Sequence, residues 1–131
     1  AGTIGNIIVW SQKTVMLSAR DVEGGALRAV NIKAQCSGSL AVHLRFVGVE
    51  KPGYAVSHIA SGLRVTHVET ERDALRIAEY LLKDPAVVLA LKEADAFSAQ
   101  QELPPWVYPW VKECRENMAW VDPIPFKQEH V

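Results

Sequence analysis

Apolar and polar residues alternate through the first half of the chain, and alternation with a period of two is typical of half-buried β-strands. The alternating stretches are separated by three short glycine-containing turns, Gly24-Gly25, Ser37-Gly38-Ser39 and Ser61-Gly62, and by a longer connection from Gly48 to Gly53. Glycine favours hairpin turns because it adopts positive φ without steric cost. The pattern predicts five strands that pair in sequence order, at residues 15–20, 27–33, 40–47, 54–60 and 63–68. A shorter apolar run at residues 7–10 is predicted to be a further strand or an anchoring arm.

The lengths of these turns predict which side chains share a face of the sheet, because successive strand residues point to opposite sides. The second turn is taken as a three-residue loop and the last turn as Ser61-Gly62 alone. One face is then predicted to carry Val15, Leu17, Ala19, Val30, Ile32, Ala34, Val42, Leu44, Phe46, Tyr54, Val56, His58, Leu63, Val65 and His67. The other face is predicted to carry Met16, Ser18, Arg20, Ala29, Asn31, Lys33, His43, Arg45, Ser57, Ile59, Arg64, Thr66 and Val68.

The second half of the chain changes to the spacing of amphipathic helices. Thr70-x-x-Asp73 resembles a capping box, with Asp in place of the usual Glu or Gln. The helix that it opens has a stripe of apolar residues at the i, i+3, i+4 and i+7 positions, namely Ala74, Ile77, Ala78 and Leu81. The chain therefore turns from sheet to helix at Thr70.

Prolines divide the remainder of the helical half. Asp84-Pro85 predicts the start of a second helix that extends to about residue 101, since the first helical position tolerates proline best. Pro104-Pro105 ends this helix. A third helix is predicted from the apolar stripe Val107, Trp110, Val111, Cys114 and Met118.

Each predicted strand has an apolar face to bury, and the helices supply the apolar stripes that bury it. The expected fold class is α+β: a five-stranded antiparallel β-meander covered on one face by two or three C-terminal helices. A chain of 131 residues is expected to form a single domain. Residues 1–69 would be mainly β, residues 70–121 mainly α, and residues 122–131 an extended tail.

Composition is that of a globular protein, with 49% hydrophobic and 22% charged residues. No apolar run approaches the roughly 18 residues that span a membrane, so no membrane association is expected. The first residues lack the basic segment of a secretion signal. Cys36 and Cys114 have neither metal-binding nor redox spacing, so reduced thiols and a cytoplasmic location are expected.

Charge is distributed unevenly between the two halves. Residues 1–67 carry seven Lys or Arg against three Asp or Glu, whereas residues 68–131 carry seven against twelve. The strand half is therefore basic and the helical half acidic, and such asymmetry bears on the choice of partner.

The polar face of the predicted sheet is the first candidate site. It presents one cation from each of four strands among short hydroxyl, amide and imidazole side chains, which suits contacts to phosphates. The predicted nucleic-acid-binding residues are Arg20, Lys33, Arg45, Arg64, Ser18, Asn31, His43 and Thr66, with Met16 and Ile59 for apolar contact to bases. The expected function is non-enzymatic binding of DNA or RNA, or regulation through such binding.

The segment around the third helix gives a competing hypothesis. Its aromatic residues Trp106, Tyr108 and Trp110 either close the core or form a docking patch for a protein partner, as in an adaptor or inhibitor. A second copy of the chain, pairing through an edge strand, is a further candidate partner.

No catalytic set, cofactor or metal site is predicted. His58 and His67 are expected to be diagonal neighbours on one face of the last hairpin, but zinc needs three or four ligands and no Cys, Asp or Glu joins them there. Their expected role is hydrogen bonding at the sheet edge.

The order of three strands and then a helix with Thr70, Ala74 and Ala78 at intervals of four resembles the sheet-plus-helix unit of several nucleic-acid-binding modules. The layout is similar to the double-stranded-RNA-binding domain, although Glu71 and Arg72 stand where that family has adjacent lysines. It is also similar to the plant-type three-stranded DNA-binding domain, without the Trp and Arg pattern of that family. The resemblance is one of layout and implies nucleic-acid binding through sheet or helix.

Overall fold

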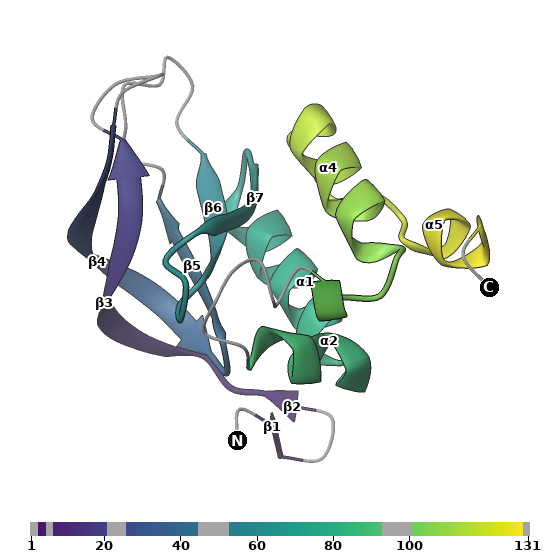
Figure 1. Ribbon diagram of the computed structural model, residues 1–131, viewed down its shortest axis with the longest axis horizontal. Coiled ribbons are helices and arrows are strands. Elements are labelled where there is room, and N and C mark those ends of the chain that lie inside the picture. Colours follow the sequence, from purple (N-terminus) through teal and green to yellow (C-terminus); the bar gives the residue numbers. More distant parts are fainter. Residues whose placement is uncertain (1–2, 5–6, 21–25, 45–52, 93–100, 130–131) are drawn as a thin grey trace.

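A computed structural model describes residues 3–4, 7–20, 26–44, 53–92 and 101–129. Five antiparallel strands form one sheet in the order β3-β4-β5-β6-β7, and the helices follow them in the chain (Figure 1). The fold is therefore α+β, with a five-stranded meander, as the alternating pattern predicted. The strands are β3 (Ser11–Arg20), β4 (Leu27–Ser37), β5 (Leu40–Leu44), β6 (Tyr54–His58) and β7 (Arg64–Val68).

The predicted arm at residues 7–10 is in part a strand. β1 (Thr3–Ile4) and β2 (Ile7–Ile8) pair with each other as a small separate hairpin. Trp10 follows this hairpin, and its Nε1 donates a hydrogen bond to Glu79 Oε1 at 2.8 Å. The N-terminal segment is thus attached to the helical half of the molecule.

Helix starts agree with the predicted caps. α1 (Glu71–Leu82) begins at Thr70, whose Oγ1 accepts from the Asp73 amide at 3.2 Å. α2 (Pro85–Leu91) begins at Asp84, whose carboxylate accepts from two amides of the first turn. These side chains satisfy amides that have no partner within the helix.

Helix ends differ from the predicted ones in two places. α2 ends at Leu91, ten residues before the predicted end, and residues 93–100 lie outside the described part of the chain. The stripe from Val107 forms α4 (Val107–Asn117). Met118 caps the C-terminal end of this helix and has a left-handed conformation with φ of 54°. The predicted extended tail instead contains a short helix, α5 (Ile124–Glu129).

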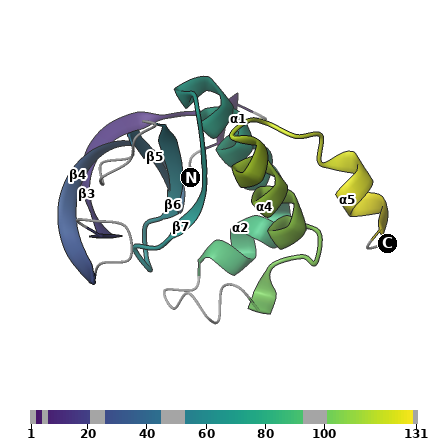
Figure 2. The same cartoon turned by 90° about the horizontal axis from the view of Figure 1, so that it is seen from above.

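The sheet is strongly curled. Viewed along its strands, it forms an arc with β3 and β4 on one side and β6 and β7 on the other (Figure 2). The Ser18 amide donates to the Gly62 carbonyl at 2.8 Å, which joins β3 to the turn between β6 and β7. The concave side of the arc holds a small cluster of buried Ala34, Cys36 and Ala41.

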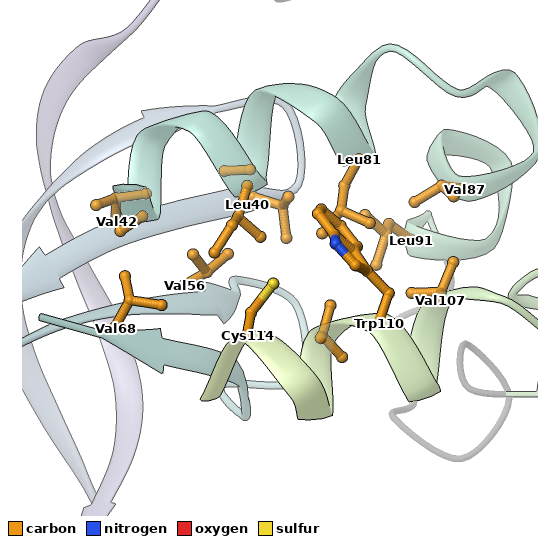
Figure 3. Packing of buried hydrophobic residues seen from close by; sticks show 14 of the residues in the cluster. Leu40, Val42, Val56, Val68, Leu81, Val87, Leu91, Val107, Trp110 and Cys114 are labelled. Carbon is orange, nitrogen blue, oxygen red and sulfur yellow. The ribbon is translucent and has the colours of Figure 1, made fainter. Parts of the chain in front are cut away.

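The helices pack against the convex side of β5, β6 and β7 (Figures 1 and 2). Leu40, Val42, Val56 and Val68 from these strands meet the apolar stripes of α1, α2 and α4, and Trp110 lies fully buried among them (Figure 3). The predicted stripes therefore cover these three strands of the sheet. None of the described helices is long and apolar enough to cross a bilayer.

The register of the second hairpin differs from the prediction by one residue. Ser37 pairs with Leu40 and Gln35 with Val42, so the turn consists of Gly38-Ser39 rather than three residues. A shift of one residue moves every side chain of a strand to the opposite face. Val42 therefore lies on the face opposite to Ala34, and the predicted sharing of one apolar face was wrong.

A second change of register occurs between β6 and β7. Val56 pairs with Thr66 and Tyr54 with Val68, while an irregularity between Val56 and Ser57 lets Ser57 pair with Arg64. A β-bulge of this kind adds one residue to one strand. As a result Thr66 and Val68 face the helices. Arg64 lies on the same face as Ser57, as predicted.

Candidate functional site

The eight residues predicted to form one nucleic-acid-binding row do not share a face. The pairing places Ser18, Asn31 and Lys33 on the convex side of the ribbon formed by β3 and β4. His43 and Arg64 belong to the concave side, and Thr66 lies beneath a helix. Arg20 is the last residue of β3 and pairs with Leu27. Arg45 lies outside the described residues. The one-residue register shifts are the cause of this separation.

Thr66 serves the core rather than a partner. Its side chain is 1% exposed, and its hydroxyl donates to the Val111 carbonyl of α4 at 2.9 Å. A buried hydroxyl costs free energy unless it is hydrogen-bonded. Thr66 therefore ties β7 to α4 and is not available to nucleic acid.

His43 and Ser57 form a buried pair on the concave face. Ser57 Oγ lies 2.8 Å from His43 Nε2, and His43 Nδ1 lies 3.0 Å from the Leu44 carbonyl. Because a carbonyl can only accept, Nδ1 carries the hydrogen, and in the neutral ring Nε2 accepts from the Ser57 hydroxyl. Burial lowers the pKa of His43; the bond to Leu44 opposes this effect, and the charge of Arg64 adds to it. The ring is thus held neutral, with both nitrogens engaged.

The ribbon formed by β3 and β4 is the exposed basic feature of the sheet. Its two strands contain four cations, Lys13, Arg20, Arg28 and Lys33, and neither strand contains Asp or Glu. The side chains of Lys13, Arg28 and Lys33 are exposed. Phosphate contacts require cations that reach solvent and have few competing carboxylates nearby.

The convex face of this ribbon also carries hydrogen-bonding groups. Its aligned pairs are Gln12 with Gln35, Thr14 with Lys33, and Met16 with Asn31. Gln12, Thr14, Asn31 and Lys33 are exposed, and Met16 is 62% exposed. Amide side chains at these positions can form paired hydrogen bonds to a base edge, and Met16 offers an apolar contact.

Sequence analysis missed part of this surface because β3 begins at Ser11 rather than Val15. Gln12 and Thr14 continue the period-two pattern of Met16 and Ser18, and that continuation was the available signal. Lys13 was missed for the same reason. Its exposed ammonium lies one register position from Lys33, on the opposite side of the ribbon.

His58 and His67 are not neighbours on one face. His58 pairs with Leu40 on the helix-covered side, whereas His67 pairs with Ala55 on the other side. His58 Nε2 donates to the Leu91 carbonyl at 2.7 Å, and Nδ1 lies 2.8 Å from Ser61 Oγ. His58 thus connects the last hairpin to the end of α2. Across the described residues, no three His, Cys, Asp or Glu side chains are grouped to hold a metal ion.

The aromatic segment near α4 belongs mainly to the core. Trp110 is fully buried and Trp106 is 6% exposed, while Tyr108 is 56% exposed. The ring centres of Trp106 and Trp110 lie 5.8 Å apart, and Tyr80 of α1 packs against both. Of the three residues predicted as a docking patch, only Tyr108 faces solvent.

The two cysteines are separate buried thiols. Burial raises the pKa of Cys36, and the charge of Lys13 opposes this. Burial is also the main cause that raises the pKa of Cys114 to about 11. Since the thiolate is the reactive form, neither environment favours a nucleophilic or redox cysteine.

A comparison of the chain with protein-family models, with curated proteins and with solved structures found no match. Functional inference therefore rests on the geometry of the chain itself.

Proposed function

We propose that this protein binds double-stranded DNA and that the ribbon formed by β3 and β4 is the contacting element. The observation that carries the proposal is the exposed convex face of the ribbon. There Gln12 and Asn31 lie beside Lys33, on two strands without any carboxylate side chain. This location replaces the row across four strands that the sequence had predicted.

The size of the element favours duplex DNA over duplex RNA. The major groove of B-DNA admits a two-stranded β-ribbon, and its base edges present distinct patterns of donors and acceptors. The major groove of A-form RNA is too deep and narrow for side chains to read. β3 and β4 pair along ten aligned positions, which gives a ribbon with enough length for such a contact.

Two kinds of contact are expected from the ribbon. Lys33 would neutralise a phosphate, which supplies affinity without sequence preference. Gln12 and Asn31 would contact base edges, where amides pair best with adenine. The helices of the acidic C-terminal half lie on the convex side of β5 to β7, away from this part of the ribbon (Figure 2). That arrangement keeps most of the negative charge away from the DNA.

The test is a titration of labelled duplex DNA at several salt concentrations, with Lys33→Gln compared to the parent protein. This substitution is expected to weaken binding and to reduce the slope of log K against log salt by about 1. Lys112→Gln is the matched control, because Lys112 is exposed on α4. Its salt slope should equal that of the parent protein.

An RNA duplex of the same sequence serves as a second probe and should bind more weakly than DNA. Absence of DNA binding would contradict the proposal. Binding that does not depend on salt, or an equal loss in Lys112→Gln, would contradict it as well. The docking alternative ranks second, because two of its three aromatic rings are buried.

A further inference from the structure

The C-terminal helix places an ammonium group against two aromatic rings. Nζ of Lys127 lies 5.3 Å from the centre of the Tyr80 ring and 5.1 Å from that of Trp106. The same Nζ donates a hydrogen bond to the Tyr80 hydroxyl at 3.2 Å. The two rings are nearly perpendicular, at 82°, with their centres 5.8 Å apart. The distances from Nζ to the two ring centres are both within the roughly 6 Å over which a cation is attracted to an aromatic face.

The two rings, which we call the Tyr80–Trp106 cage, are held by the core and not by α5. Tyr80 belongs to α1, and Trp106 precedes α4 directly. Both rings pack against the fully buried Trp110, at centre distances of 5.3 and 5.8 Å. A cation site is more effective when its walls are preorganised, because no free energy is then spent on ordering them.

Lys127, which occupies the cage, belongs to a helix that is attached to the core much less firmly than the two rings are. α5 contains six residues and lies at one end of the molecule (Figures 1 and 2). Ile124, Pro125 and Gln128 are exposed, and Phe126 is its partly buried apolar contact with the core. Release of Lys127 would therefore leave the sheet and its covering helices in place.

We propose that the Tyr80–Trp106 cage is a binding site for a quaternary alkylammonium group and that Lys127 occupies it within the same chain. A primary ammonium is strongly hydrated and keeps a hydrogen bond to Tyr80, whereas a quaternary ammonium is held by the rings alone. The excess of acidic residues in residues 68–131 favours a cation at this end of the molecule. The ligand could be a free quaternary amine or a trimethylated lysine side chain, which share this chemistry.

The experiment compares choline binding to the parent protein and to Lys127→Gln by calorimetry and by the indole NMR signals. Lys127→Gln removes the competing charge, so its affinity for choline should rise by roughly 2- to 30-fold. Lys112→Gln, an exposed substitution on α4, should leave the affinity unchanged. The uncharged isostere 3,3-dimethylbutan-1-ol should bind much more weakly than choline.

Substitutions at Tyr80 separate the ring from its hydroxyl. In the Lys127→Gln background, Tyr80→Phe keeps the ring and should retain choline binding, while Tyr80→Leu should lose it, with circular dichroism confirming that both fold. An acetylated trimethyllysine amide, compared with choline, identifies which source of the ammonium binds more tightly. Equal affinity of the parent protein and Lys127→Gln would overturn the proposal. Equal binding of the uncharged isostere, or no binding to folded Lys127→Gln, would overturn it too.

Discussion

Whether a polar residue of this sheet has a structural role or is accessible to a partner depends on its burial and not on its residue type. Thr66 and Thr14 each stand next to a valine in a strand, yet Thr66 donates to Val111 beneath α4 while Thr14 is exposed on the ribbon. His43 is similar to Thr66 in this respect, since its ring is buried and bonded to Ser57. Residues that look equivalent in a strand pattern therefore divide into structural and accessible groups.

His43 should make stability depend on pH. Burial lowers its folded-state pKa below the unfolded value of 6.5. As pH falls below about 6.5, the unfolded chain takes up a proton that the folded chain resists, so the free energy of unfolding falls until the folded pKa is passed. The stabilising contribution is thus present above 6.5 and lost in acid.

Urea unfolding at several pH values between 7.5 and 5 checks this expectation, in steps of about half a unit. As the pH falls, the free energy of unfolding of His43→Gln should decrease less than that of the parent protein. The charge of Arg64 and the ring of His67 lie on the same concave face as His43. His67→Gln is therefore the matched control, and its free energy of unfolding should keep most of the dependence on pH. If the free energy of unfolding of His43→Gln depended on pH as strongly as that of the parent protein, His43 would be ruled out as the source of the pH dependence.

At the level of elements, the sequence predicted the type and order of structure but not the pairing register. Period-two alternation and the caps at Thr70 and Asp84 are local signals, and the strands, α1 and the start of α2 agree with them. The length of the Gly38-Ser39 turn and the bulge at Val56 and Ser57 depend on how distant strands pack. Those two features decide which face each side chain occupies, and so the predicted single row of cations was wrong.

The curl of the sheet depends on the contact between β3 and the last turn. Gly62 has φ of +74°, and a Cβ placed there would lie 3.2 Å from the Ser18 amide nitrogen, which donates to the Gly62 carbonyl. Gly38 has a similar φ of +55°, but a Cβ there would meet only Leu82 at 3.4 Å. The two glycines share a left-handed backbone and differ in their surroundings.

Gly38→Ala is expected to cost about 1–2 kcal/mol from the left-handed backbone alone. Gly62→Ala should cost more, because its methyl group also pushes against the backbone of Ser18. Urea midpoints of the two variants give the comparison, and the difference reports on the closing contact. Equal losses would show that this contact contributes little to the curl.

For the molecule as a whole, the two halves divide charge but share one core. The main cluster combines Leu40, Val42 and Val56 of the sheet with Leu81 of α1 and Trp110 of α4 (Figure 3). Side chains buried to this degree contribute about 1.5–3 kcal/mol each. The concave cluster, by contrast, consists of Ala34, Cys36 and Ala41 with partly buried neighbours, which is small for a sheet of this size.

The strand half is therefore not expected to fold alone. A fragment of residues 1–69 would expose Leu40, Val42, Val56 and Val68, since all four are covered by helices in the complete chain. Its thermal melt should lack a cooperative transition, whereas the complete chain should unfold in one step. Mixing this fragment with a separate fragment of residues 70–131 should restore a cooperative melt, because the helices supply the missing half of the core. A cooperative transition in residues 1–69 alone would mean that the concave cluster suffices, and that the ribbon proposed to bind DNA could be separated from the helical half.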